Sequence, residues 1–317
     1  MIKKIVYITG CLGFIGIHIT RLCLSRGWYV VGVDKMTYAS NQTFLAEFEK
    51  NKNFTFIKTD INDITRLVDC DYIINTAAET HVDNSIISSD VFLRSNINGV
   101  HHLLELIKQQ PRHKQPIFLH FSTDEVYGDI EVGVHTESDL LKPSNPYSAS
   151  KAAADMLVLA WARTYGIKYI IVRPTNNYGI GQYVEKLIPK SVKFLELGKL
   201  IDLHDRGNPI RTWLHAGDTA NAMISIIDAG ITNEIFNISG NIELPNSEVI
   251  KKILQLYYGV DHDNDWETFT TPSARIGQDV RYAIDDSKLK KLGWLPTADF
   301  DQELEQVVEY YRNNFIW

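Results

Sequence analysis

The stretch KKIVYITGCLGFIG, residues 3–16, decides the fold of this chain. Its first half is an apolar run rich in β-branched residues that ends at Gly10, and Gly13 and Gly16 follow at regular spacing. A run without polar alternation is typical of a strand that is buried on both faces of a sheet. Glycines directly after such a strand allow a tight turn into a helix and let a pyrophosphate approach the backbone. The stretch therefore predicts a strand, a turn and a helix that together bind a dinucleotide.

The same alternation continues along the first half of the chain. Further apolar runs predict strands at 28–34, 54–60, 72–78, 116–123 and 168–174. Helical patterns lie between them, near 13–26, 42–50, 86–110 and 146–165. Strands that alternate with helices in this way build parallel sheets with helices on both faces. We therefore expect an α/β protein: a doubly wound parallel sheet of the Rossmann type with a smaller mixed α/β substrate-binding lobe.

After about residue 174 the segments shorten, and polar turns such as DRGNP (205–209) separate them. A last helix is predicted at about 301–313, where apolar residues recur at helical spacing. From this change of pattern we expect two domains. The dinucleotide-binding Rossmann domain covers residues 1–178 plus about 212–240, and the substrate-binding domain covers about 179–211 and 241–317.

Composition excludes several classes of function. The 317 residues carry 32 Lys and Arg against 39 Asp and Glu, a net charge of −7, and no basic cluster predicts a nucleic-acid partner. The most apolar stretch, 5–19, is shorter than the ~20 residues that a membrane span needs. Three cysteines are too few for a disulfide framework, so we expect a reducing, cytoplasmic location. No metal is expected, because Trp266 stands where the acidic loop DHDNDWE (261–267) would need the glycine of a calcium loop.

Asp34 ends the second predicted strand, roughly 20 residues beyond the glycines, where a carboxylate accepts hydrogen bonds from a ribose 2′-hydroxyl. A 2′-phosphate would be repelled there, so NAD is favoured over NADP. Lys35 is the next residue, and a cation at that position could tolerate a phosphate. Asp60 ends the third predicted strand, where it could meet the adenine edge or form an Asx turn.

Tyr147 and Lys151 lie four residues apart at the start of the helical pattern, and hence on one face of a helix. A phenol ordinarily titrates near 10, too high for a proton acceptor at neutral pH. A neighbouring ammonium group lowers a phenol pKa by roughly 1–3 units, and NAD⁺ adds further positive charge. The spacing therefore predicts that Tyr147 acts as the general base for an alcohol that is being oxidised.

Together these motifs place the chain in a known family. TGCLGFIG (9–16), STDEVYG (122–128) and NPYSASKA (145–152) resemble the extended short-chain dehydrogenase/reductases, and specifically the dTDP-glucose 4,6-dehydratase family. The similarity runs almost end to end. It continues through VDKMTYASN (33–41), NTAAETHVDNSI (75–86), RPTNNYG (173–179), EKLIP (185–189) and RYAIDDSK (281–288).

The resemblance implies a hydro-lyase, a nucleotide-sugar 4,6-dehydratase with tightly bound, recycled NAD. Such an enzyme oxidises the hexose at C4, eliminates water across C5 and C6, and returns the hydride to C6. By similarity, Asp124 is the acid that protonates the leaving hydroxyl and Glu125 is the base at C5, while Thr123 bonds the reacting hydroxyl. Two carboxyl groups with separated pKa values suit these two roles.

The resemblance also implies the residues that bind the cofactor and the substrate. The cofactor residues are Gly10, Gly13, Phe14, Ile15, Gly16, Asp34, Lys35, Met36, Thr37, Asp60, Ile61, Ala77, Ala78, Thr80, Ser95, Tyr147, Lys151 and Asn177. The nucleotide-sugar residues are Thr80, Thr123, Asn176, Lys186, Leu187, Arg211, Asn246 and Arg275. Among them, arginine suits a pyrophosphate because its planar fork binds two oxygens at once.

Several alternatives stay open at this point. The family usually has arginine where Asn84 stands, and proline and histidine where Ile276 and Gln278 stand, so the nucleotide (dTDP or UDP) and the sugar (glucose or N-acetylglucosamine) are undecided. A dehydratase that also inverts C5, a nucleotide-sugar 4-epimerase and a silent NAD-sensing or scaffold protein are the rival functions. The family further implies a homodimer that forms through a four-helix contact between the 86–110 and 146–165 helices.

Overall fold

A seven-stranded, wholly parallel sheet forms the centre of the molecule, in the order β10-β6-β5-β4-β1-β2-β3. The structure is a computed structural model that describes residues 3–314. The strands are β1 (Ile5–Thr9), β2 (Tyr29–Asp34), β3 (Phe54–Lys58), β4 (Tyr72–Asn75), β5 (Ile117–Phe121), β6 (Tyr169–Pro174) and β10 (Glu234–Ile238). The first six fall within the predicted runs, and the expected doubly wound α/β fold is confirmed.

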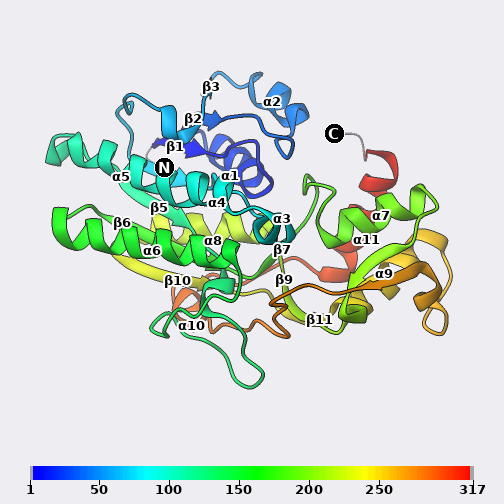
Figure 1. Ribbon diagram of the computed structural model, residues 1–317. Coiled ribbons are helices and arrows are strands. Elements are labelled where there is room, and N and C mark those ends of the chain that lie inside the picture. The colour runs from blue at the N-terminus through cyan, green and yellow to red at the C-terminus, as the bar shows by residue number, and fades with distance from the viewer. Residues whose placement is uncertain (1–2, 315–317) are drawn as a thin grey trace.

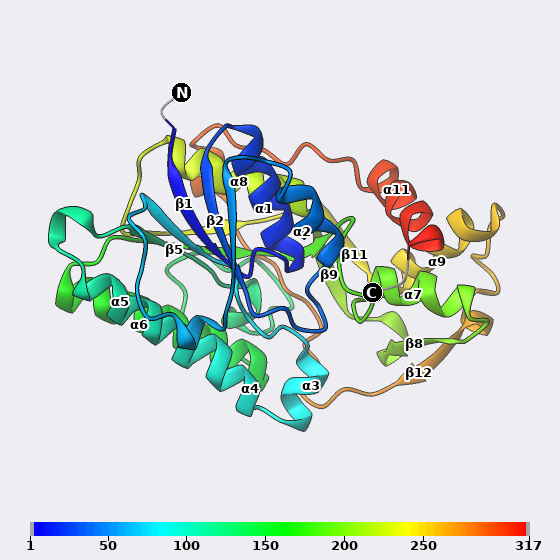
Figure 2. The ribbon, with the colours of Figure 1, turned by 90° about the horizontal axis from the view of Figure 1, so that it is seen from above.

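Helices cover both faces of this sheet (Figures 1 and 2). α5 (Gly99–Gln109) and α6 (Pro146–Tyr165) pack together on one face. α1 (Phe14–Ser25) and α8 (Ala216–Asp228) pack together on the other, and α2 (Gln42–Phe48) lies beside α1. Each face has its own buried cluster of apolar side chains, so the strands are buried on both sides, as their unbroken apolar sequences predict.

The helical pattern near 86–110 is not one helix. It is divided into α3 (Val82–Ile87), α4 (Asp90–Phe92), a π-helical segment η2 (Leu93–Asn98) and α5. Ser88 is extended, with φ −152° and ψ 116°, and serine side chains compete for backbone hydrogen bonds at such breaks. The widened π turn lies next to the candidate site, and Ser95 and Asn96 within it are buried.

The smaller lobe stands beside the carboxyl ends of the central strands (Figure 2). It contains a three-stranded sheet, β11 (Ile242–Pro245), β9 (Ile210–His215) and β7 (Asn176–Tyr178), and a strand pair, β12 (Thr270–Ser273) and β8 (Ile201–His204). Its helices α7 (Leu187–Glu196), α9 (Asn246–Tyr258) and α11 (Phe300–Asn313) enclose a separate apolar cluster. The short helix α10 (Ser287–Lys290) contacts β10 instead.

The chain passes between the two regions more than once. β10 returns to the central sheet beside β6 after the chain has built β8 and β9 in the smaller lobe. The two-domain boundaries given above stay a prediction. Within residues 3–314, no helix is both long enough and apolar enough to cross a membrane.

The turn after β1 generates the first testable prediction. A β-carbon added at Gly16 would lie 2.0 Å from the carbonyl oxygen of Gly10, an atom of the backbone that cannot rotate away. Gly16→Ala should therefore lower the free energy of unfolding by about 2 kcal/mol or more, because either the turn or helix α1 must shift. Denaturant unfolding measures this loss.

The matched control is Gly13→Ala in the same turn, where the nearest atom to an added β-carbon is 3.3 Å away. It should destabilise the protein less than Gly16→Ala does. Equal unfolding midpoints for Gly16→Ala and the unsubstituted protein would contradict the close packing of this turn.

Candidate active site

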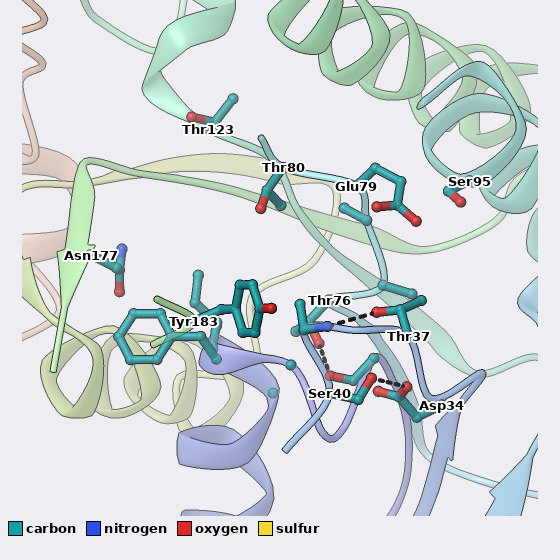
Figure 3. A pocket seen from close by; sticks show the side chains of 18 of the residues that line it. Asp34, Thr37, Ser40, Thr76, Glu79, Thr80, Ser95, Thr123, Asn177 and Tyr183 are labelled. Atoms are coloured by element: carbon teal, nitrogen blue, oxygen red, sulfur yellow. Dashed lines mark hydrogen bonds between the residues drawn. The ribbon is translucent and has the colours of Figure 1, made fainter. Parts of the chain in front are cut away.

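One cavity lies where the carboxyl ends of β1, β2, β4 and β5 meet the smaller lobe, at the edge where open α/β sheets bind ligands. Figure 3 shows Asp34 and Ser40 at one end of this cavity and Thr123 at the other. Most of the predicted site residues line it. They are Gly10, Gly13, Phe14, Ile15, Gly16, Asp34, Lys35, Thr37, Asp60, Ile61, Ala77, Ala78, Thr80, Ser95, Thr123, Asp124, Glu125, Tyr147, Asn176, Asn177 and Lys186.

Six predicted residues do not line the cavity. Met36 turns its backbone N–H to Asp34, and Leu187 begins α7. Lys151 lies beneath the cavity wall, fully covered on α6. Arg211, Asn246 and Arg275 belong to the smaller lobe or its connecting loops.

The glycine turn after β1 packs so closely against the backbone that follows β4 that a side chain at Gly10 would not fit. Gly10 has a φ of +72°, and a β-carbon there would lie 2.6 Å from the backbone nitrogen of Ala77. The turn thus presses against the segment that follows β4. Residues of both segments line the cavity, and a glycine turn between a strand and a helix suits a pyrophosphate.

Asp34 is held by three donors at the end of β2. Its carboxylate accepts hydrogen bonds from the backbone N–H of Leu12 (3.1 Å) and Met36 (2.7 Å) and from the Ser40 hydroxyl (2.8 Å). These bonds fix the carboxylate at the cavity rim, where it fits a ribose 2′-hydroxyl.

Lys35 does not turn its charge toward a 2′-phosphate. Its ammonium group donates to Glu79 at 3.0 Å and to the Ser95 hydroxyl at 3.1 Å, and Asp60 lies 3.9 Å away. Asp60 also accepts from the backbone and side-chain nitrogens of Asn62, so it forms the Asx turn that was one of its two predicted roles while it lines the cavity. Because two carboxylates flank Lys35, the pocket favours the unphosphorylated ribose.

Two carboxyl groups lie side by side at the end of β5. Thr123 precedes the turn η4 (Asp124–Tyr127), and its hydroxyl donates to Asp124 Oδ1 at 3.2 Å. The other oxygen, Oδ2, is buried without a hydrogen-bond partner among residues 3–314. Burial and the neighbouring Glu125 raise the pKa of Asp124 to about 7. Asp124 is therefore suited to carry a proton on the oxygen that Thr123 leaves free.

Glu125 lies in a more open setting with cations nearby. Burial raises its pKa, whereas Arg211, Lys186 and a hydrogen bond from Asn145 (3.5 Å) act in the opposite direction. Arg211 also lowers the pKa of Asp124, but Lys186 favours the charged form of Glu125 and the Glu125 charge favours the proton on Asp124. The tendency to hold a proton is thus greater for Asp124 than for Glu125, as an acid and a base require.

Tyr147 owes its position to the start of α6. The Asn145 side chain caps the helix by accepting a hydrogen bond from the backbone N–H of Ser148. The Ser148 hydroxyl in turn accepts from the backbone N–H of Asn145. Pro146 occupies the first turn. Tyr147 therefore enters the cavity wall from the first helical turn, and Lys151 follows on the same face one turn later.

The expected lowering of the Tyr147 pKa is not present in the protein alone. Burial and Glu125 raise it well above its usual value, and a hydrogen bond with Thr123 opposes them only in part. Lys151 instead donates to the carbonyl oxygen of Phe121 at 2.5 Å, and burial lowers its own pKa to about 8. The Lys151 ammonium group is thus bonded to β5, and the role of Tyr147 as general base, which also counts on the positive charge of NAD⁺, stays a prediction.

The predicted phosphate-binding cations have protein partners. Lys186 donates to the carbonyl oxygen of Thr80 at 2.8 Å, on the cavity wall. Arg211 donates to the carbonyl oxygens of Ile210, Val280 and Asp279, and its guanidinium stacks on the Tyr282 ring.

Arg275 forms a two-bond ion pair with Asp83 of α3, at 2.6 and 2.9 Å. His204 lies 3.5 Å from the same carboxylate. In the smaller lobe, the Asn246 side-chain oxygen is buried without a hydrogen-bond partner among the described residues, and so is that of Asn176 at the cavity.

Sequence reasoning missed several lining residues: Ser40, Thr76, Glu79, Ser122, Gln182, Tyr183 and Glu185. Most of them lie inside the family motifs quoted above, so the motifs could have indicated these residues. Ser40 belongs to VDKMTYASN and Glu79 to NTAAETHVDNSI. In the described part of the chain, no group of three or more His, Cys, Asp or Glu side chains is placed to hold a metal ion.

Comparisons with known proteins agree with this geometry. A family model described as GDP-mannose 4,6 dehydratase matches residues 7–307. The dTDP-glucose 4,6-dehydratase of Haemophilus influenzae is 39% identical over 331 residues, which cover 98% of each chain.

Two solved structures extend the likeness to three dimensions. DesIV, a dTDP-glucose 4,6-dehydratase from Streptomyces venezuelae with NAD bound, has a TM-score of 0.90 and 36% identity over 98% of this chain and 97% of that one. The dTDP-glucose 4,6-dehydratase of Bacillus anthracis in complex with NAD has a TM-score of 0.86 and 34% identity, with the same coverage. The chain thus belongs to the dTDP-glucose 4,6-dehydratase family.

Proposed function

We propose that this protein is an NAD-dependent nucleotide-sugar 4,6-dehydratase, which converts a dTDP- or UDP-hexose into the 4-keto-6-deoxy sugar nucleotide. The observation that carries the proposal is the pair Asp124 and Glu125, which share one cavity wall with Tyr147. A simple dehydrogenase needs a base for one hydroxyl proton only. Elimination of water also needs a base that accepts the C5 proton and an acid that protonates the leaving hydroxyl, and this pair supplies the two carboxyl groups.

The residues of the cavity fit NAD. Side chains at Gly10 or Gly16 would collide with backbone, the Asp34 carboxylate is fixed at the rim, and Lys35 is balanced by Glu79. When bound, NAD supplies the hydride acceptor for oxidation at the sugar C4 and the donor for reduction at C6. The DesIV and Bacillus anthracis relatives hold NAD, which supports the same cofactor here.

Tyr147, Thr123 and Lys151 would manage the C4 hydroxyl. Thr123 lies within hydrogen-bond reach of Tyr147, so the two hydroxyl groups converge on one point of the wall. A positive nicotinamide and the Lys151 ammonium group would both favour the Tyr147 phenolate, against the burial that raises its pKa in the protein alone. In this proposal, proton transfer from the substrate depends on cofactor binding.

Asp124 and Glu125 would carry out the elimination. Once C4 is a ketone, the proton at C5 is acidic because its loss gives an enolate. Glu125 is the proposed base at C5, and Asp124, whose raised pKa keeps it protonated near neutral pH, is the proposed acid at the C6 oxygen.

We propose dTDP-glucose as the first substrate, since the relatives named above are dTDP-glucose 4,6-dehydratases. Lys186 at the cavity and Arg211 beside the carboxyl pair are the proposed cations for the pyrophosphate. Arg275 would have to leave Asp83 to take part. A 4-epimerase eliminates no water and would need no acid and base for that step, so Asp124 and Glu125 argue against that alternative.

We further propose a cytoplasmic homodimer. Val91 and Met156, 52% and 47% exposed on α4 and α6, are apolar side chains without cover on the face where the four-helix contact is expected.

The proposed reaction is tested with purified protein and a panel of dTDP-glucose, UDP-glucose and UDP-N-acetylglucosamine. Mass spectrometry should show the loss of one water from dTDP-glucose. A product of unchanged mass would indicate epimerisation, and no turnover of any member of the panel would contradict the enzymatic function.

Glu125→Gln removes the proposed base but keeps the size of the side chain. The variant should still oxidise C4 to some extent, so absorbance of reduced nicotinamide accumulates with substrate, while formation of dehydrated product falls about 100-fold or more. Glu305→Gln, at an exposed position on α11, is the matched control and should behave as the unsubstituted enzyme does. Normal product yield from Glu125→Gln would refute its role as the base.

The pKa of Asp124 predicts a pH dependence. An acid must be protonated to donate, and the pKa of Asp124 is raised to about 7, so kcat for dehydration should fall as pH rises through about 7. Asp124→Asn should be slower by about 100-fold, and its residual rate should lack this limb because an amide does not titrate. The same falling limb in both proteins would assign it to another group.

A further inference from the structure

A continuous series of buried polar side chains crosses the central sheet beneath the candidate site. The Thr9 hydroxyl on β1 donates to the Asn75 oxygen on β4 at 2.6 Å. The Asn75 amide nitrogen lies 3.1 Å from Nδ1 of His120 on β5. All three side chains are 0% exposed. Their strands are direct neighbours in the sheet, so the three residues bridge from the glycine turn toward helix α6.

The direction of these bonds fixes the His120 ring. Because the Asn75 oxygen is taken by Thr9, its amide nitrogen faces His120 and donates to Nδ1. The ring proton is then on Nε2, which lies 3.7 Å from Asp155 Oδ1. That distance is too long for a hydrogen bond, and neither atom has a hydrogen-bond partner among the described residues. Burial and the nearby cations hold the pKa of His120 well below its usual value, so a neutral ring lies beside the carboxylate.

Asp155 stands in this series between two cations. Arg173 on β6 contacts Asp155 Oδ2 through Nε and Nη2, both at 2.9 Å, and also donates to the Tyr127 hydroxyl at 2.7 Å. Lys151 lies one helical turn before Asp155 on α6 and feels its charge. Asp155 is 0% exposed, and Arg173 and Lys151 are 2% and 3% exposed. Asp155 is thus paired with Arg173, and Lys151 lies near enough on the same helix for the Asp155 charge to act on it.

Around Lys151 the charge of Asp155 is the attractive one. Burial lowers the pKa of Lys151 to about 8, and Asp155 raises it. Four elements pack around Lys151 and carry titratable or charged side chains. Helix α6 carries Tyr147 and Asp155, and the strands β5 and β6 carry His120 and Arg173. The turn η4 carries Asp124, Glu125 and Tyr127. His120 is neutral and Arg173 is a cation, and of the three carboxyl groups Asp155 is the one whose charge raises the pKa of Lys151.

Loss of the carboxylate would leave two cations without a counter-charge in a buried place. A guanidinium group cannot give up its proton in a protein, whereas a buried lysine does so readily. Lys151 would then be the group that becomes neutral. Its neutral form cannot stabilise a phenolate at Tyr147.

We propose that Asp155 is a positioning residue which keeps Lys151 protonated for proton transfer at Tyr147, that Arg173 holds the Asp155 carboxylate in place, and that the Thr9–Asn75–His120 series keeps a neutral ring beside it. The assignment of a catalytic consequence rests on the proposed dehydratase function. The electrostatic part concerns Lys151 alone and does not depend on turnover.

The test compares Asp155→Asn with Arg173→Gln, which break the same ion pair from opposite sides. A merely structural pair predicts the same effect from both variants. The positioning role predicts opposite behaviour of Lys151, because one variant removes its attractive partner and the other removes a cation. The direct readout is the pH titration of the Lys151 side-chain nitrogen by NMR of ¹⁵N-lysine-labelled protein, with Lys151→Met to assign the signal.

In Asp155→Asn the pKa of Lys151 should fall by about one unit or more, while in Arg173→Gln it should stay or rise. The pH profile of C4 oxidation in a single turnover should move to lower pH in Asp155→Asn by the same shift. An unchanged Lys151 pKa in Asp155→Asn, or an equal fall in both variants, would overturn the proposal.

If either single variant fails to fold, the double variant Asp155→Asn/Arg173→Gln removes both buried charges and serves instead. Its Lys151 pKa should lie below that of the unsubstituted protein, and an equal pKa would overturn the proposal. If the unsubstituted protein dehydrates no sugar nucleotide, the proposed function fails while the titration still decides the electrostatic part.

Discussion

The desolvation of two neighbouring carboxyl groups is the constraint on which the rest of this structure depends. Asp124 and Glu125 follow one another at the end of β5, and burial raises the pKa of both. Like charges so close cannot both ionise without cost, so one of the pair keeps its proton. Asp124 is the one that keeps it, because the charge of Glu125 raises the pKa of Asp124 while Lys186 lowers that of Glu125; the hydrogen bond from Thr123 opposes this only in part.

The fold brings this carboxyl pair and the glycine turn after β1 to the same cavity. The parallel sheet places the ends of β1, β2, β4 and β5 at one edge, so groups far apart in sequence line one cavity. The turn at Gly10 and Gly16 leaves backbone exposed for phosphates, and the cap at Asn145 starts α6 where Tyr147 must stand. Each feature follows from local residue chemistry, and together they bring the proposed hydride-transfer residues and the proposed elimination residues to one cavity.

Periodicity and glycine spacing were sufficient to predict the parallel sheet and the dinucleotide turn, because buried strands and tight turns restrict residue type strongly. The break at Ser88 and the π turn at 93–98 were not predictable, because helical spacing of apolar residues continues through them. Spacing also places Lys151 on the same helix face as Tyr147, but it does not reveal that the Lys151 ammonium group donates to the carbonyl oxygen of Phe121. Pairs such as Arg275 with Asp83 are equally invisible, since their partners are distant in sequence.

The protonation state of Asp124 is the most direct test of this account. NMR of protein labelled with ¹³C at the aspartate carboxyl carbon, with Asp124→Asn to assign the signal, follows that group through its titration without substrate. The account predicts an Asp124 signal that titrates near a pKa of about 7. An Asp124 carboxyl that is already ionised at the ordinary aspartate pKa of about 4 would contradict it.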